Sequence, residues 1–228
     1  MSEWVKLHLV VEGETELSFA RDTLKPHLAL CLVSVNPFML PTNRKLGAAG
    51  GALSWERFSY NVTRLLKQFG TNADRFSTMI DWYKLDPHFP GYTEARKLSK
   101  PAGRASAVAQ AVQKEFDSPR LLAFFTLHEF EAFLFCDLST VAKRLPDHDK
   151  AIASLRAEIG STPPEDVDDG PHTHPSARLE KHVPGYHRAK VRVGAPAAGE
   201  IGLPVLRERC PHFGQWLDRL EKLAQQQN

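Results

Sequence analysis

One stretch decides the fold of this chain: VVEGETE, residues 10–16. Residues 4–11 are mostly apolar and predict a strand, while residues 14–28 predict a helix. Strand-to-helix turns of this kind in α/β proteins usually surround a phosphate with backbone N–H groups. Here the turn carries carboxylates, which repel a bare phosphate. A divalent cation between the carboxylates and the phosphate would remove this repulsion.

The composition predicts a globular protein with one main core. The chain has 228 residues, 42% of them apolar, and a formal net charge of +2. This charge excludes a strongly basic nucleic-acid coat protein but leaves room for a local basic groove. No apolar run approaches the ~20 residues of a membrane span, and no signal region follows the N-terminus, so we expect a cytoplasmic protein without membrane contact.

The cysteines do not form a recognisable motif. Cys31, Cys136 and Cys210 are far apart, and no C-x-x-C pair is present. Neither a zinc ribbon nor a disulfide framework is indicated. Their apolar surroundings predict buried thiols.

Strands alternate with helices over the first part of the chain, which predicts an α/β fold with a parallel sheet flanked by helices. This core is predicted to span residues 1–136. Residues 137–228 are predicted to form a mainly helical extension packed on the core. Further strands are predicted at residues 31–40, 75–83 and 120–127, helices at 55–69, 102–116, 138–145, 150–159 and 201–223, and loops at 42–51, 86–92 and 161–175.

Acidic residues stand at or near the ends of three of the predicted strands. Glu12, Asp81 and Glu129 each come after an apolar run. In open α/β sheets, ligands bind outside the carboxyl ends of the strands, and carboxylates suit Mg²⁺ or Mn²⁺. Taken singly, each acid is as well explained as a helix cap or salt-bridge partner. Glu14 and Glu16, in the first helical turn, are equally well explained by the helix dipole.

These residues resemble the bacterial DUF4276 family of Toprim-like proteins. The resemblance covers nearly the whole chain through short motifs in a fixed order. They are VEGETE at 11–16, IDWY at 80–83 with FPG at 89–91, HEFEAFLF at 128–135, Tyr186 with Lys190, IGL at 201–203, and CPHF at 210–213 with Trp216.

The resemblance implies a Toprim or Rossmann-like sheet with an acidic metal site. It implies that Glu12 acts as an acid, base or metal ligand, and that Asp81 is the first aspartate of an Asp-x-Asp pair. Tyr83 stands where the second aspartate is expected, which removes one ligand. Glu129, Glu131 or Asp86 could replace it. Relatives of this kind are often encoded beside an ABC-type or AAA-type ATPase in anti-phage systems, so an ATPase partner is expected by similarity.

Basic residues offer candidate contacts to a nucleic-acid backbone, because such contacts need only positive charge. An ordinary solvated surface explains them equally well. Lys190 is the first choice for a group that faces a phosphate. The other candidates are Arg44, Lys45, Lys97, Lys100, Arg104 and Arg188.

These features together predict a metal-dependent nuclease that hydrolyses DNA or RNA with Mg²⁺ or Mn²⁺ held by Glu12, Asp81, Glu129 and Glu131. Lys190 completes the predicted catalytic set. The main alternative is a non-catalytic Toprim-like subunit or sensor in a defence complex, which Tyr83 favours. Nucleotidyl transfer is a third hypothesis, weakened by the lack of a nucleotide-binding loop. The sequence does not fix the oligomeric state, and a homo-oligomer is compatible with it.

Overall fold

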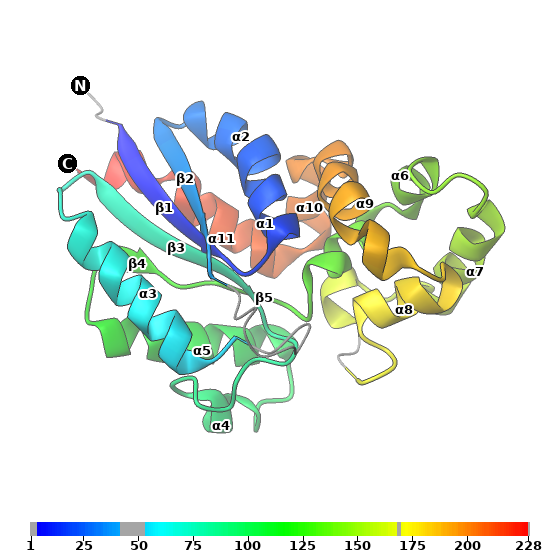
Figure 1. Cartoon of the computed structure of the whole chain (residues 1–228), viewed down its shortest axis with the longest axis horizontal. Helices are drawn as coiled ribbons and strands as arrows, with labels where there is room; N and C mark the ends of the chain where they lie inside the picture. The colour runs from blue at the N-terminus through cyan, green and yellow to red at the C-terminus, as the bar shows by residue number, and fades with distance from the viewer. Residues whose placement is uncertain (1–3, 42–52, 168–169, 228) are drawn as a thin grey trace.

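A parallel β-sheet forms the centre of the computed structural model, which describes residues 4–41, 53–167 and 170–227. The strands lie in the order β2-β1-β3-β4, and β5 also pairs with β3 (Figure 1). All described pairings are parallel, so the predicted α/β class is confirmed. The strands are β1 Val5–Val11, β2 Val33–Met39, β3 Asp74–Asp81, β4 Leu121–Leu122 and β5 Phe125–Thr126.

Strand β1 separates two apolar layers because its side chains alternate between the two faces of the sheet. Leu9 packs into a core shared with helices of the C-terminal half, including Phe213. Val10, on the opposite face, packs with Phe58 and Val108 from the helices on that side. A strand that is buried on both faces has a nearly continuous apolar sequence, which explains why residues 4–11 are mostly apolar.

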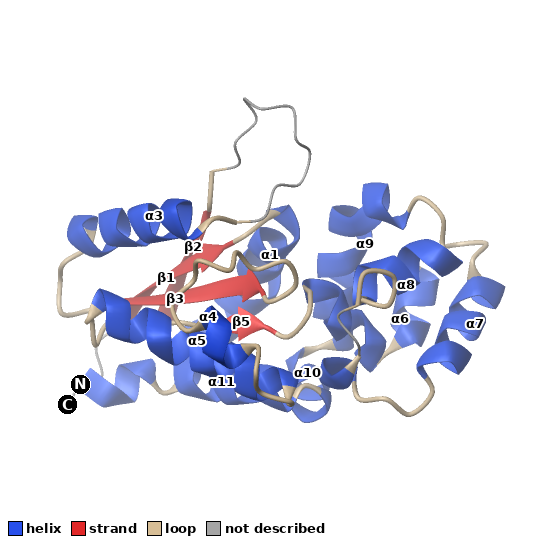
Figure 2. Ribbon diagram, turned by 90° about the horizontal axis from the view of Figure 1, so that it is seen from below, coloured by secondary structure: helices blue, strands red, loops and turns tan. Residues whose placement is uncertain are grey.

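Helices cover both faces of the sheet, and the C-terminal half is helical as predicted (Figures 1 and 2). One helical run extends from residue 14 to 29 and contains a π-helical turn, Ala20–Leu24. Within the described residues, no helix is long and apolar enough to cross a membrane. The helices are α1 Glu14–Phe19, α2 Lys25–Ala29, α3 Trp55–Gln68, α4 Tyr92–Ala95, α5 Pro101–Phe116, α6 Leu138–Lys143, α7 Asp149–Ile159, α8 Pro175–His182, α9 Tyr186–Ile201, α10 Leu203–Arg209 and α11 Pro211–Glu221, with 3₁₀ segments η3 Phe130–Cys136, η4 Pro164–Asp166 and η5 Leu223–Gln227.

Residues 120–127 do not form the single strand that their composition predicts. The two short strands β4 and β5 are separated by Ala123 and Phe124. Thr78 Oγ1 accepts a hydrogen bond from Phe124 N and donates one to Phe124 O, both at 2.7 Å. A side chain thus replaces the backbone ladder at this point and interrupts the strand. The prediction of one continuous strand was wrong for this reason.

A buried hydrogen bond links His8 of β1 to Asp74, the first residue of β3. His8 Nε2 lies 2.8 Å from Asp74 Oδ1, and Asp74 is 2% exposed. Thr71 donates to Asp74 Oδ2 from both its backbone N, at 2.8 Å, and its hydroxyl, at 2.6 Å. Burial opposes ionisation of Asp74, but His8 and Thr71 outweigh it and lower its pKa to about 2.

Replacing Asp74 with Asn is expected to destabilise the protein at neutral pH. The pKa of the folded carboxyl lies below its unfolded value, so its stabilisation is present above pH ~4 and lost as the pH falls toward 2. The pKa difference corresponds to about 2 kcal/mol. Urea denaturation at pH 7 and pH 3 measures it. Equal stability of wild type and variant at pH 7 would show that the pair contributes nothing.

Candidate active site at the carboxyl edge of the sheet

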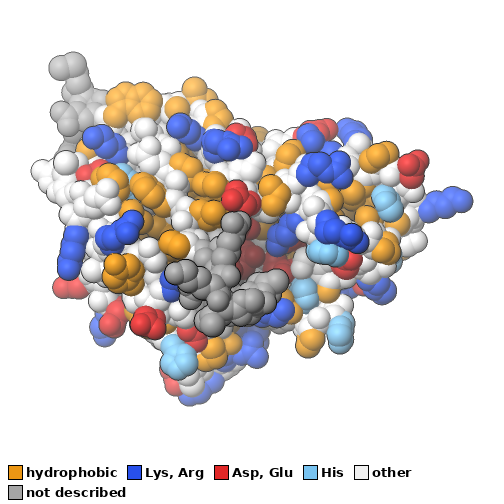
Figure 3. All heavy atoms as spheres, in the orientation of Figure 1, with side chains coloured by type: hydrophobic (Ala, Val, Ile, Leu, Met, Phe, Trp, Pro, Cys, Tyr) orange, Lys and Arg blue, Asp and Glu red, His pale blue; other side chains and the backbone are white. Residues whose placement is uncertain are grey.

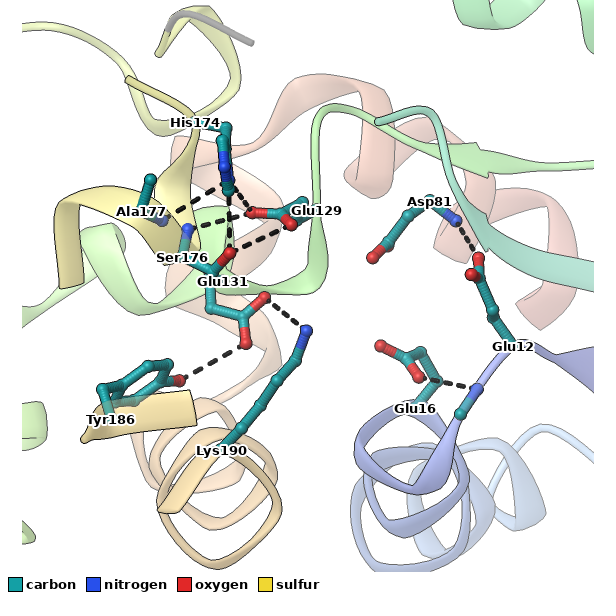
Figure 4. Close-up of polar contacts among 11 residues, drawn as sticks. Glu12, Glu16, Asp81, Glu129, Glu131, His174, Ser176, Ala177, Tyr186 and Lys190 are labelled. Carbon is teal, nitrogen blue, oxygen red and sulfur yellow. Dashed lines mark hydrogen bonds and ion pairs between the residues drawn. The ribbon is translucent and has the colours of Figure 1, made fainter. Parts of the chain in front are cut away.

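Glu12 and Asp81 lie side by side, because they end the neighbouring parallel strands β1 and β3. The backbone N of Asp81 donates to Oε2 of Glu12 at 3.3 Å (Figure 4). Oδ1 of Asp81 is enclosed and accepts no hydrogen bond from any described residue. A buried carboxylate oxygen without a partner is costly, which marks Asp81 as a residue kept for something other than stability.

Glu16 joins this pair, although the sequence alone gave it no more than a helix-dipole role. It is only 4% exposed, and its Oε2 accepts a hydrogen bond from Gly13 N at 3.0 Å. Glu14, by contrast, is exposed. The signal for Glu16 is its position three residues after Gly13, the residue before the helix, because a glutamate there bends back to the backbone N–H of that residue.

Glu131 and Lys190 face the three acids from the C-terminal half. Glu131 is fully buried in η3, and its Oε2 lies 3.1 Å from Nζ of Lys190, which α9 carries. The hydroxyl of Tyr186, one turn earlier in α9, lies 3.5 Å from Oε1. Figure 4 shows the Lys190 side chain reaching across toward the side of the site that holds Glu16 and Asp81.

The electrostatics of the site reflect an excess of negative charge. Burial raises the pKa of Glu12 and Glu16, and it raises that of Asp81 well above the ordinary range, with neighbouring carboxylates adding to the shift at Asp81. Burial likewise raises the pKa of Glu131 to about 7, although Lys190 opposes this. Burial alone lowers the pKa of Lys190, but the surrounding carboxylates raise it above its ordinary value, so the amine stays charged.

Arg57, on α3, is a second cation near the acids. Burial is the main influence on the pKa of Glu12 and raises it. Arg57 offsets part of this rise, together with the Asp81 N–H and Lys190. The Arg57 Nε is enclosed and has no hydrogen-bond partner among the described residues. In the space-filling view, acidic side chains lie in a hollow between the sheet and the C-terminal helices, with basic side chains near its rim (Figure 3).

Glu129, predicted as a metal ligand, has both carboxylate oxygens engaged elsewhere. Ser176 donates to Oε2 from its backbone N at 2.9 Å and to Oε1 from its hydroxyl at 3.0 Å. His174 Nδ1 lies 2.9 Å from Oε2. These contacts tie Glu129 to the first turn of α8, and Figure 4 shows its carboxylate turned toward them. Tyr83 belongs to the same assembly, since its ring stacks on His174 with centroids 4.1 Å apart.

Replacing Glu129 with Ala is expected to destabilise the fold by about 2 kcal/mol, because a nearly buried carboxylate loses contacts that fix the start of α8. Thermal and urea denaturation measure this loss. Glu14→Ala, at an exposed position, is the matched control and should change stability by less than about 0.5 kcal/mol. Equal effects of the two substitutions would contradict the structural role assigned to Glu129.

Among the described residues, the predicted nucleic-acid contacts either have other partners or are exposed. Arg44 and Lys45 lie outside the described residues. Lys97 pairs with Glu94 at 2.7 Å, and Arg104 Nε donates to a backbone oxygen of residue 98. Lys100 precedes α5 and Arg188 lies on α9, and both are exposed. Of the predicted basic set, Lys190 is the described residue whose side chain contacts the acidic site.

The donor chemistry fits a hard divalent cation. Glu12, Glu16 and Asp81 offer oxygen ligands, and the unpartnered oxygen of Asp81 is an available one. The described residues nevertheless contain no group of three or more acidic, His or Cys side chains already arranged to hold a metal ion. The charge and ligand type of the site therefore suit Mg²⁺ or Mn²⁺, without a preformed coordination shell.

Comparison with known proteins gives a family and no characterised relative. The profile of a family described as "Domain of unknown function (DUF4276)" matches residues 11–221. No curated protein and no solved structure matches the chain. The matched range contains all of the acidic residues described above together with Lys190.

Proposed function

Since this chain belongs to the DUF4276 family, whose function is not defined, we propose from its site that it is a metal-dependent phosphodiesterase acting on DNA or RNA. One observation carries the proposal: Asp81, which has an enclosed and unpartnered carboxylate oxygen, lies beside Glu12 at the carboxyl edge of a parallel sheet. The positions that such sheets use for ligands are these strand ends.

The chain's own residues supply most of the proposed mechanism. Glu12, Glu16 and Asp81 would hold Mg²⁺ or Mn²⁺, which polarises a phosphate and lowers the pKa of water. Lys190 stays protonated beside them and offsets negative charge on the substrate phosphate. Glu131 holds the ammonium group of Lys190 in place. Glu12, whose pKa burial raises, is the proposed general base.

The finer parts of the proposal rest on resemblance. The sheet and its acidic edge are consistent with a Toprim-like nuclease. By resemblance to such proteins, we propose that this chain acts in a bacterial anti-phage system. It would work in the cytoplasm together with an ABC-type or AAA-type ATPase. In this proposal the exposed Lys100 and Arg188 contribute to binding the nucleic-acid backbone through charge alone.

Cleavage assays test the proposal directly. Purified protein is incubated with plasmid DNA or single-stranded RNA and Mg²⁺ or Mn²⁺, with EDTA as the metal-free control. Wild type and Glu14→Gln, which alters an exposed carboxylate in the same turn, should cleave, whereas Glu12→Gln should not. Cleavage by Glu12→Gln at the wild-type rate would assign the activity to a contaminant or another site.

A non-catalytic subunit is the second candidate, and one observation favours it. Tyr83, two residues after Asp81, stacks on His174 and so contributes no carboxylate to the site. Metal binding without cleavage of any nucleic acid, also when an ABC-type or AAA-type ATPase proposed as its partner is added, would favour this candidate. Metal binding is measured as the change in the melting temperature of the protein when Mn²⁺ is added.

A further inference from the structure

Two cysteines that are distant in the sequence meet in the core of the C-terminal half. Cys136 ends η3 and Cys210 lies between α10 and α11, yet their Sγ atoms are 3.4 Å apart. They are 2% and 0% exposed. The sulfurs are already in van der Waals contact, and closure to a disulfide bond of ~2.05 Å needs an approach of about 1.4 Å.

The surroundings of Cys136 give it both access and positive charge. It lines a cavity of about 310 Å³ whose wall also includes the exposed Arg156 and Arg209. Arg209 Nη1 donates to the backbone oxygen of Cys136 at 2.6 Å, which places a guanidinium beside this cysteine. Cys210 is not among the residues that line the cavity, so an oxidant reaches Cys136 first.

We propose that Cys136 and Cys210 are a redox-active pair that forms a reversible intramolecular disulfide on exposure to a peroxide. The Cys136 sulfur attacks a peroxide oxygen, the O–O bond breaks, and Cys136 becomes a sulfenic acid while the other oxygen takes up the thiol proton and leaves as water or an alcohol. Cys210 sulfur then attacks the Cys136 sulfur, the S–O bond breaks, and the hydroxide leaves as water with the Cys210 proton. Two thiols lose two electrons and one peroxide gains them.

The contact between the two sulfurs supports this division of roles. The hydrogen bond with Cys136, together with burial, raises the pKa of Cys210, so Cys210 keeps its proton until it attacks the oxidised Cys136. The disulfide would join the end of η3, whose first turn carries Glu131, to the junction of α10 and α11. Neither cysteine belongs to the acidic site, so the redox pair does not depend on the proposed phosphodiesterase activity.

Thiol counting and peptide mapping test the pair on the full chain. The reduced protein is treated with hydrogen peroxide, denatured and alkylated, and its tryptic peptides are analysed by mass spectrometry. We expect two of the three cysteines to escape alkylation, a mass loss of about 2 Da for the two hydrogens removed, and a Cys136–Cys210 cross-linked peptide that dithiothreitol abolishes. Cys31→Ser, which removes the half-buried third cysteine, should behave identically.

Two further variants separate the steps. Cys210→Ser should accumulate a sulfenic acid at Cys136 that dimedone labels, and Cys136→Ser should leave Cys210 alkylatable after peroxide. If both variants fail to fold, the mapping of wild type and Cys31→Ser decides alone. Three free thiols after a peroxide dose that oxidises the exposed methionine Met39, or a disulfide that involves Cys31 or a second chain, would overturn the proposal.

Discussion

Replacing Asp81 with Asn is expected to lower metal-dependent cleavage by at least about 100-fold and, at the same time, to stabilise the fold. The loss follows from removing the charge of the carboxylate that has an unpartnered oxygen at the site. The gain follows because burial and neighbouring carboxylates raise the pKa of Asp81 well above its ordinary value, so that keeping an acid there costs free energy.

The pH dependence gives the sign of the stability effect. An acid whose folded pKa exceeds its unfolded pKa binds more protons when folded, so its contribution to stability falls as the pH rises above about 4. Asn does not titrate, so the variant lacks this loss of stability. It should therefore unfold at higher urea concentrations than wild type at pH 7, with a smaller difference at pH 4. The gain at pH 7 is expected to match the size of a typical single-substitution effect, about 1 kcal/mol.

Asp86→Asn is the matched control for Asp81→Asn. Asp86 lies outside the acidic cluster, where its oxygens accept hydrogen bonds from Trp55 N and His88 N, and its pKa is lowered rather than raised. This substitution should reduce stability and leave cleavage unchanged. If Asp81→Asn loses stability as Asp86→Asn does, the carboxylate of Asp81 is structural and the proposed site is wrong.

The placement of Glu12 beside Asp81 could be predicted, because the carboxyl ends of neighbouring parallel strands meet at one edge. The contact between Asp81 N and Glu12 confirms that they are neighbours. The environment of Glu129 could not be predicted in the same way. Its partners, His174 and Ser176, come from a segment some 45 residues away whose path no local pattern fixes.

The helix that carries Lys190 was also missed, and packing explains why it exists. Helix α9 contains Gly194, Pro196 and Gly199, which lower its helix propensity. A Cβ at Gly199 would come within 2.7 Å of Thr23 Oγ1, and one at Gly194 within 3.3 Å of Thr15 Cγ2. These glycines allow α9 to approach the helical run that starts after Glu12, so tertiary packing outweighs local propensity and brings Lys190 to the acids.

Replacing Lys190 with Met is expected to destabilise the protein by about 3 kcal/mol and to abolish cleavage. The substitution keeps an apolar stem but leaves Glu131, which is fully buried, without its cation. Removing one partner of a buried pair costs more than the pair itself contributes, because the remaining charge is left unpaired. Without Lys190, the pKa of Glu131 should rise beyond its present value of about 7, so the variant should lose stability as the pH rises from 5 to 8.

The double variant Lys190→Met with Glu131→Gln distinguishes an electrostatic cause from a packing defect. The neutral amide that replaces the Glu131 carboxylate needs no counter-ion, so the double variant should recover at least about half of the lost stability and its pH dependence should flatten. Cleavage should stay absent, because the ammonium group that faces the acids is still missing. Arg192→Met, at an exposed position two residues further along α9, is the matched control for removing a cation from this helix and should leave stability within about 0.5 kcal/mol. If the double variant is as unstable as Lys190→Met at every pH, the pairing of Lys190 with Glu131 is not what holds α9 against the acidic site.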